Sequence, residues 1–231
     1  MKKTFLALLA LLSFNLSAQE YFQQEVNYTI DVELNDENHT LKGMEYIDYT
    51  NNSPNDLGFI WFHLWPNAYK DNSTALYKQK IENGSTSLYY ASEAERGYID
   101  GLNFKVDGKI VRWGYDTEHI DICKLILNKP IRAGESIRIS TPFFVKIPDA
   151  KFSRLGHVKQ SYMITQWYPK PAVYDKDGWH QMPYLDQGEF YSEFGSFDVS
   201  ITLPSNYTVG ATGDLQNKGE IKRLNQLAKA T

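Results

Sequence analysis

Cysteine is almost absent from this chain, which contains one in 231 residues, Cys123. No internal disulfide can form, and a zinc site built from several cysteines is excluded. The fold must therefore be stabilised by packing. Cys123 lies in the strand-like run 121–125, where a thiol is typically inert, because a reactive thiol needs an electropositive setting that lowers its pKa.

The short motifs of the commonest enzymes are also missing. No G-x-S-x-G elbow, P-loop or Rossmann glycine pattern is present, and no H-E-x-x-H occurs. The segment 175–180 holds two carboxylates and an imidazole, but this is too few oxygen ligands for calcium, so a plain turn is predicted. Asp186, Glu189 and Glu193 form a weak candidate acid/base set, because nothing in the sequence places two of them face to face.

Long apolar runs are missing as well. The first 18 residues resemble a secretory signal, with Lys2 and Lys3 before an apolar run at 5–12 and small residues at the cleavage point. That run is shorter than the ~20 residues that cross a bilayer, and no second candidate follows. We therefore expect export to the periplasm or the extracellular space, with no membrane span in the mature chain.

Positive charge is in modest deficit. Beyond residue 18 there are 22 Lys and Arg (24 minus Lys2 and Lys3) against 28 Asp and Glu, a net charge of −6 with neutral histidines. A mildly acidic surface argues against a nucleic-acid partner.

What is present is mostly strand pattern. Apolar residues alternate with polar ones over 26–34, and a returning strand follows at 41–49, with Gly43 interpreted as a bulge. The nearly continuous apolar run 58–65 predicts a strand covered on both faces. For residues 67–100 we predict a long surface loop, with one helical turn at 92–96.

The second half continues the same pattern. Asp107-Gly108 predicts a type I′ hairpin turn. Short strands are expected at 124–127, 136–140 and 143–147, and a strand of strict alternation at 197–203. Apolar positions between 221 and 228 then follow a helical period. The predicted fold class is all-β in the main, a twisted antiparallel, saddle-like β-sandwich with a short C-terminal helix.

The segment 164–204 contains the pattern that bears most on function. It joins Thr165-Gln166, the run Met182-Pro183-Tyr184-Leu185-Asp186 and the strand 197–204. In this order the three pieces resemble the T-Q sequence, the F-P-C-x-D-E-P box and the following strand of the aminopeptidase N family of zinc metallopeptidases (gluzincins, peptidase family M-one). The strands from 26 to 49, Phe62-His63-Leu64 and the turn at 130–135 fit the N-terminal β domain of that family.

The resemblance has departures and implications. No Arg follows Ala172, the box cysteine is Tyr184, and D-E-P is replaced by Asp186-Gln187-Gly188. The resemblance implies that Gln166 lines the peptide-binding end of the active site. It implies zinc in the intact enzyme, with its ligands outside these residues, so that neither a metal site nor a catalytic residue is expected in this chain.

The implied organisation is a signal peptide at 1–18, an aminopeptidase N-like N-terminal β domain at 19–215, and at 216–231 the start of a truncated helix or a connection toward an absent catalytic domain. The expected function is that of a substrate-capping domain of a secreted aminopeptidase, inactive by itself. Its partners are the catalytic domain of the same polypeptide and peptide substrates.

Other interpretations stay open at this point. Gln166 is equally well explained as a strand residue that bonds the backbone, and His63 as a core or edge histidine. The chain is alternatively a stand-alone secreted β-sandwich module that binds glycans or protein partners with its aromatic residues. Its candidate stacking platforms are Trp61, Trp65, Trp113, Trp167 and Trp179.

Overall fold

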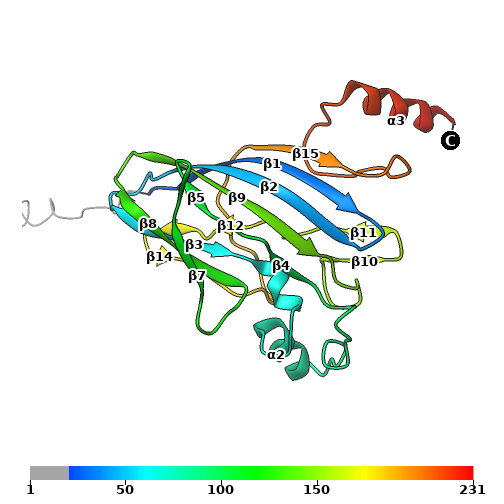
Figure 1. Cartoon of the computed structure of the whole chain (residues 1–231), viewed down its shortest axis with the longest axis horizontal. Coiled ribbons are helices and arrows are strands. Elements are labelled where there is room, and N and C mark those ends of the chain that lie inside the picture. The colour runs from blue at the N-terminus through cyan, green and yellow to red at the C-terminus, as the bar shows by residue number, and fades with distance from the viewer. Residues whose placement is uncertain (1–20, 231) are drawn as a thin grey trace, which may run out of the picture.

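The computed structural model describes residues 21–230. The predicted signal peptide at 1–18 lies outside the described residues. Within them the chain is mainly β, with two larger sheets and two small hairpins (Figure 1). All but one of the strand pairings are antiparallel. The predicted fold class, a mainly antiparallel β-sandwich with a short C-terminal helix, is confirmed.

Two sheets form the layers of the sandwich. The long sheet has seven strands in the order β15-β1-β2-β9-β5-β6, with β4 also pairing β9, and the short sheet has four in the order β12-β3-β8-β7. The long sheet contains β1 (Glu25–Asn35), β2 (Thr40–Thr50), β4 (Tyr98–Asp100), β5 (Lys105–Val106), β6 (Lys109–Ile110), β9 (Ser136–Lys146) and β15 (Phe197–Thr202). The short sheet contains β3 (Leu57–His63), β7 (Arg112–Tyr115), β8 (Ile122–Ile131) and β12 (Lys170–Pro171).

The remaining elements lie between and beyond these strands. One hairpin joins β10 (Gly156–Val158) to β11 (Ser161–Met163), and another joins β13 (Tyr174–Asp175) to β14 (Gly178–Trp179). The helices are the 3₁₀ helix η1 (Trp65–Tyr69), α2 (Ala75–Glu82) and α3 (Lys218–Ala230). Figure 1 shows β1, β2 and β9 side by side, α2 at the lower edge of the view and α3 beyond β15.

The main core lies between the two larger sheets. Alternation along β1 turns Val26, Tyr28, Ile30 and Val32 inward, where they join buried side chains of β2, β9, β3 and β8. Burial of these apolar faces is the main stabilising contribution, about 25 cal/mol per Å² removed from water. The two alternating patterns at 26–34 and 41–49 are confirmed as β1 and β2, which pair along their whole length.

The predicted bulge at Gly43 is wrong. The pairing of β2 with β1 and β9 runs through Gly43 without a register shift. A Cβ at this position would lie 2.2 Å from the ring Cζ of Phe143. Glycine is therefore required here because the Phe143 ring occupies the space over its Cα.

The strands expected at 136–140 and 143–147 are one strand. Pro142 lies inside β9, opposite Met44 of β2. On the other side of β9, β5 pairs residues 139–140 and β4 pairs residues 144–146. These two partners leave a gap along that side of β9, and Pro142 lies in it. Pro142 has no backbone N–H to donate, so its place in the gap costs no hydrogen bond to a neighbouring strand.

The predicted surface loop at 67–100 is also wrong. Residues 65–69 form η1 and residues 75–82 form α2, which Thr74 caps by accepting a hydrogen bond from the Tyr77 N–H. Trp65, Tyr69 and Leu76 are buried in a second core. At 92–96 there is a turn in which the Glu95 N–H donates to the Ser92 carbonyl, as the prediction of one helical turn required.

The hairpin and the last predicted strand are present. Asp107 and Gly108 have φ of 48° and 76°, the positive values that a type I′ turn needs. β15 lies at the edge of the long sheet and pairs parallel with β1. Every residue of β15 is exposed, although the Phe197 ring stacks on Tyr28 of β1 with centroids 4.6 Å apart.

Candidate functional site

Gln166 lies in the segment between β11 and β12. It is not a strand residue, and its backbone is left-handed, with φ of 52°. A non-glycine residue rarely adopts this conformation, which costs about 1–2 kcal/mol unless its surroundings compensate. The interpretation of Gln166 as a strand residue that bonds the backbone therefore does not describe this structure.

The Gln166 side chain is anchored by Lys170. The Lys170 Nζ lies 2.8 Å from the Gln166 Oε1 and 2.8 Å from the Ser192 Oγ. It also lies 4.1 Å from the ring centroid of Trp65, within range of a cation–π contact. Within residues 21–230, no other partner of the Gln166 side chain is found, so its amide N–H groups remain available to donate.

Lys170 is unusual because it is buried without a counter-ion. The residue is 6 % exposed, and no carboxylate of residues 21–230 pairs with it; the ion-paired lysines of this region are Lys80, Lys151 and Lys176. Burial disfavours the charged form and lowers the pKa of Lys170 to about 7. The site therefore contains an amine that titrates near neutral pH.

The pairing of β12 with β3 places Lys170 beside His63. β12 runs antiparallel to β3, which places Lys170 opposite His63 and Pro171 opposite Phe62. The Ala172 N–H then donates to the Trp61 carbonyl. β12 is the edge strand of the short sheet, a position where a proline is tolerated.

His63 and Trp65 form the inner wall beside Lys170. Their rings stack with centroids 4.3 Å apart. The His63 Nε2 accepts a hydrogen bond from the Met182 N–H, and burial together with the Lys170 charge lowers the pKa of His63 to about 3. His63 is thus a neutral, buried histidine, which confirms its interpretation as a core residue.

The segment that resembles the family box is held against this wall. The Trp65 Nε1 donates to the Met182 carbonyl, and the Tyr184 N–H donates to Asp121 Oδ2 at 2.7 Å. Asp186 pairs with the largely buried Lys80 of α2 at 3.1 Å. The segment 182–186 is therefore held in part by η1 and α2, the elements that the sequence did not reveal, and in part by His63 and Asp121.

The other candidate residues do not assemble into a reaction centre. Asp186 pairs with Lys80, Glu193 accepts from the Tyr174 N–H at 3.4 Å, and no contact within residues 21–230 joins two of Asp186, Glu189 and Glu193. Burial raises the pKa of Glu193 to about 7.

The segment 175–180 is the predicted turn, formed by β13 and β14. Its Asp175 Oδ1 lies 2.7 Å from the His180 Nε2. In the described part of the chain, no three His, Cys, Asp or Glu side chains lie close enough to hold a metal ion. The residues described therefore do not fit zinc. Cys123 is buried, and burial raises the pKa of its thiol.

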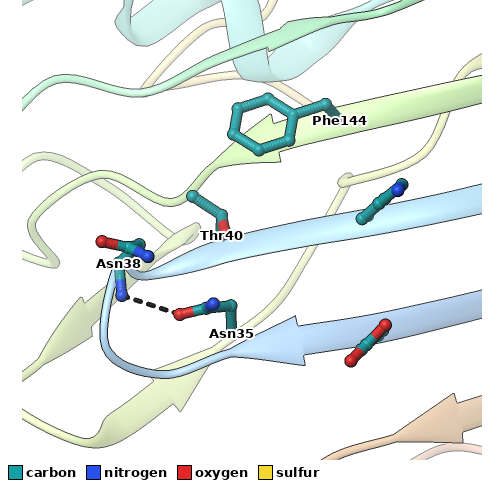
Figure 2. A pocket seen from close by; sticks show the side chains of 6 residues that line it. Asn35, Asn38, Thr40 and Phe144 are labelled. Atoms are coloured by element: carbon teal, nitrogen blue, oxygen red, sulfur yellow. Dashed lines mark hydrogen bonds between the residues drawn. The ribbon is translucent and has the colours of Figure 1, made fainter.

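The tryptophans offer no open platform. All five lie within the described residues, and each is buried or half-buried. A hollow of about 400 Å³ lies elsewhere, where β1 turns into β2. Figure 2 shows Asn35, Asn38 and Thr40 around this turn, with Phe144 of β9 beside them. The Asn35 carboxamide oxygen there already accepts from the Asn38 N–H at 2.9 Å.

Sequence reasoning singled out Gln166 but missed Lys170 and Ser192. The available signal was the position of Lys170, a charged residue between Pro169 and Pro171 in an otherwise aromatic and apolar segment. Its burial depends on the pairing with β3, which the segment alone does not reveal. Around Gln166 the site offers hydrogen-bond donors, which suit binding.

No helix within residues 21–230 is long and apolar enough to cross a membrane. No protein-family model matches the chain, and no curated protein matches it. Among solved structures, it is similar to an M1 zinc metallopeptidase from Deinococcus radiodurans, with 11 % identity, a TM-score of 0.46, and coverage of 84 % of this chain and 36 % of that chain. A mutant of an M1 zinc metallopeptidase from the same organism, bound to a Tyr-ser-ala substrate, gives 14 % identity, the same coverage and the same TM-score.

A putative nutrient binding protein from Legionella pneumophila gives 11 % identity and a TM-score of 0.30, over 54 % of this chain and 40 % of that chain. The chain thus spans about a third of the length of the metallopeptidase structures, 36 % in the two cases given above. TM-scores this low leave the function to be inferred from the residues of the chain itself.

Proposed function

We propose that the chain is the N-terminal substrate-capping domain of a secreted zinc aminopeptidase, in which Gln166 contacts the peptide. Support comes first from the sequence, where Thr165-Gln166, the segment 182–186 and the strand 197–204 follow one another in the order that resembles the aminopeptidase N family. A zinc site and a hydrolytic Glu are assigned to a catalytic domain of the same polypeptide, because the described residues do not fit zinc.

The observation that carries the proposal is the state of the Gln166 side chain. Its carbonyl oxygen is fixed by Lys170, its backbone is held in a left-handed conformation, and its amide N–H groups are unused within residues 21–230. Backbone strain and unused donors on a half-buried side chain are typical of a group kept ready for a ligand. The Gln166 amide nitrogen is not among the buried atoms that lack a partner, so its donors are accessible to water or to a ligand.

The proposal assigns binding, and no chemical step, to this chain. The donors at Gln166 orient a peptide end, while the buried Trp65 holds the segment 182–186 in place. Export to the periplasm or the extracellular space is part of the same proposal, supported by the signal-like residues 1–18.

The test compares peptide affinity in two variants of the chain. Gln166→Ala should weaken the binding of a short peptide by about 1–3 kcal/mol, the usual cost of one lost polar contact. Gln216→Ala is the matched control, because Gln216 is exposed and, within the described part of the chain, its side chain bonds only the nearby Asp214 carbonyl. Equal affinities for the wild-type chain and Gln166→Ala would refute the proposed contact.

A further inference from the structure

We propose that the hollow where β1 turns into β2 is a carbohydrate-binding subsite that takes a neutral sugar ring of an oligosaccharide. The hollow has a volume of about 400 Å³ and is lined by Glu33, Asn35, Asn38, Thr40, Lys42 and Phe144. The inference goes beyond the proposed function, because it concerns a second site on the other face of the long sheet.

The hollow lies on the outer face of that sheet. Along β1 the even-numbered residues from Val26 to Val32 point into the core, so Glu33 points to the opposite side. The segment that carries Gln166 packs on the inner face, where the Tyr168 and Tyr28 rings lie with centroids 5.5 Å apart. A ligand in the hollow therefore leaves the Gln166 site free.

The strands under the hollow have no free edge. β1 lies between β15 and β2, and β2 lies between β1 and β9. The far side of β9 pairs with β4 and β5. Because both sides of these strands are occupied by neighbours, a peptide cannot add here as a further strand. The ligand must therefore be recognised by side chains.

Three of the lining side chains stand in one row across the sheet. Glu33 of β1 pairs with Lys42 of β2, and Lys42 pairs with Phe144 of β9. Opposite charges on directly paired residues stabilise a sheet when they interact. Neither Glu33 nor Lys42 belongs to an ion pair within residues 21–230, however. A carboxylate and an ammonium thus remain available to a ligand in the hollow.

The turn at the end of the hollow is fixed by one of its own side chains. The Asn35 Oδ1 accepts from the Glu37 N–H at 3.1 Å and from the Asn38 N–H at 2.9 Å, the second of which is drawn in Figure 2. Among residues 21–230, no partner of the Asn38 carboxamide or of the Thr40 hydroxyl is found. The backbone of the turn is therefore ordered, and two of its polar side chains are left to bond a ligand.

The chemistry of the lining groups matches a neutral sugar. The row holds one negative and one positive charge, so an ion of either sign would meet one like charge. A sugar hydroxyl can donate to the Glu33 carboxylate or accept from the Lys42 ammonium. The half-buried Phe144 ring, whose centroid lies 6.2 Å from that of Tyr98, offers an apolar surface to the C–H face of a pyranose. An aromatic surface with a few polar groups is typical of small-molecule sites.

The experiment titrates the 231-residue chain with the neutral trisaccharides maltotriose, cellotriose and triacetylchitotriose, and with trigalacturonate as a charged probe. Binding is followed through the side-chain amide signal of Asn38 in ¹⁵N–¹H spectra, which is assigned by its loss in Asn38→Asp. We expect at least one neutral trisaccharide to shift this signal with a Kd of about 1 mM or tighter. That trisaccharide should bind at least about fivefold more tightly than trigalacturonate.

The variants test the carboxylate and the ring separately. Glu33→Ala should lower the affinity about tenfold, because it removes hydrogen bonds to a charged group. Its matched control is Glu37→Ala, an exposed carboxylate of the same turn that does not line the hollow and whose loss should leave binding unchanged. Phe144→Leu keeps an apolar side chain without the flat ring and should lower the affinity at least about threefold. Phe194→Leu, at a ring that is 81 % exposed outside the hollow, should have no effect.

Urea unfolding checks that each variant is folded, and Glu33→Ala, which changes an exposed side chain, decides the question if Phe144→Leu is not. The inference is overturned if no neutral trisaccharide shifts the Asn38 signal at about 10 mM. Tighter binding of trigalacturonate, or an affinity that either folded variant leaves unchanged, would also overturn it. Gln166→Ala should bind the trisaccharide as the wild-type chain does, so the failure of one proposal does not decide the other.

Discussion

Replacing Lys170 with methionine should remove a pH dependence of stability from this protein. The folded chain lowers the pKa of Lys170 from 10.5 to about 7 by burial. Between these values the unfolded chain binds more protons, so the free energy of unfolding rises with pH across this window, and the full cost of the charge applies below pH 7. With about 1.4 kcal/mol per pKa unit, the wild-type chain should gain about 2–3 kcal/mol between pH 6 and pH 9.

The variant has a thioether in place of the amine and should lack that gain. The variant also loses the hydrogen bonds to Gln166 and Ser192, and this loss offsets part of the stability gained by removing the buried charge. We expect Lys170→Met to be more stable than the wild-type chain by about 1–2 kcal/mol at pH 6, and this advantage to vanish by pH 9. Carboxyls with raised pKa values, such as Glu193 and Asp121, affect both proteins equally, so the difference isolates Lys170.

The assay is urea unfolding followed by tryptophan fluorescence at pH 6, 7.5 and 9. Lys129→Met is the matched control, because Lys129 is exposed and its replacement should leave the pH slope unchanged. If the wild-type chain and Lys170→Met show the same slope, Lys170 is not a buried ammonium, and the reasoning about its pairing with Gln166 is refuted.

Two further predictions concern the core of the long sheet. Gly43→Ala should lower the free energy of unfolding by about 1–3 kcal/mol, because its Cβ would enter the Phe143 ring, and Gly43→Ala with Phe143→Leu should recover part of this loss in urea unfolding. Glu45 is buried, and neither carboxyl oxygen has a partner within residues 21–230; burial raises its pKa, so stability falls as pH rises above 4.5. The difference in free energy of unfolding between Glu45→Gln and the wild-type chain should therefore favour the variant more at pH 7 than at pH 4. An equal difference at both pH values would contradict this.

Local patterns predicted the strands well where one face meets the core. β1 and β2 follow from strict alternation, and the Asp107-Gly108 turn follows from residues that tolerate positive φ. The same pattern at 197–203 predicted β15 but not its parallel pairing or its exposed face. Which strand lies beside an edge, and what covers it, depend on contacts far away in the sequence.

The missed features have weak or misleading signals in the local sequence. α2 buries only Leu76 and Lys80, so residues 75–82 carry little helical period, although Thr74 is a recognisable cap. Pro142 suggested a strand end, but its place between the partners of β9 makes it harmless. For the site, the sequence indicated Gln166, but Lys170 becomes visible only when β12 pairs with β3.

The central claim is that this chain binds the peptide and does not hydrolyse it. The most direct test is to incubate the purified chain with zinc and an aminoacyl chromogenic substrate, and to measure zinc content and turnover on the same sample. We predict neither stoichiometric zinc nor turnover. Tightly bound zinc at one ion per chain, with turnover that a chelator removes, would contradict the account.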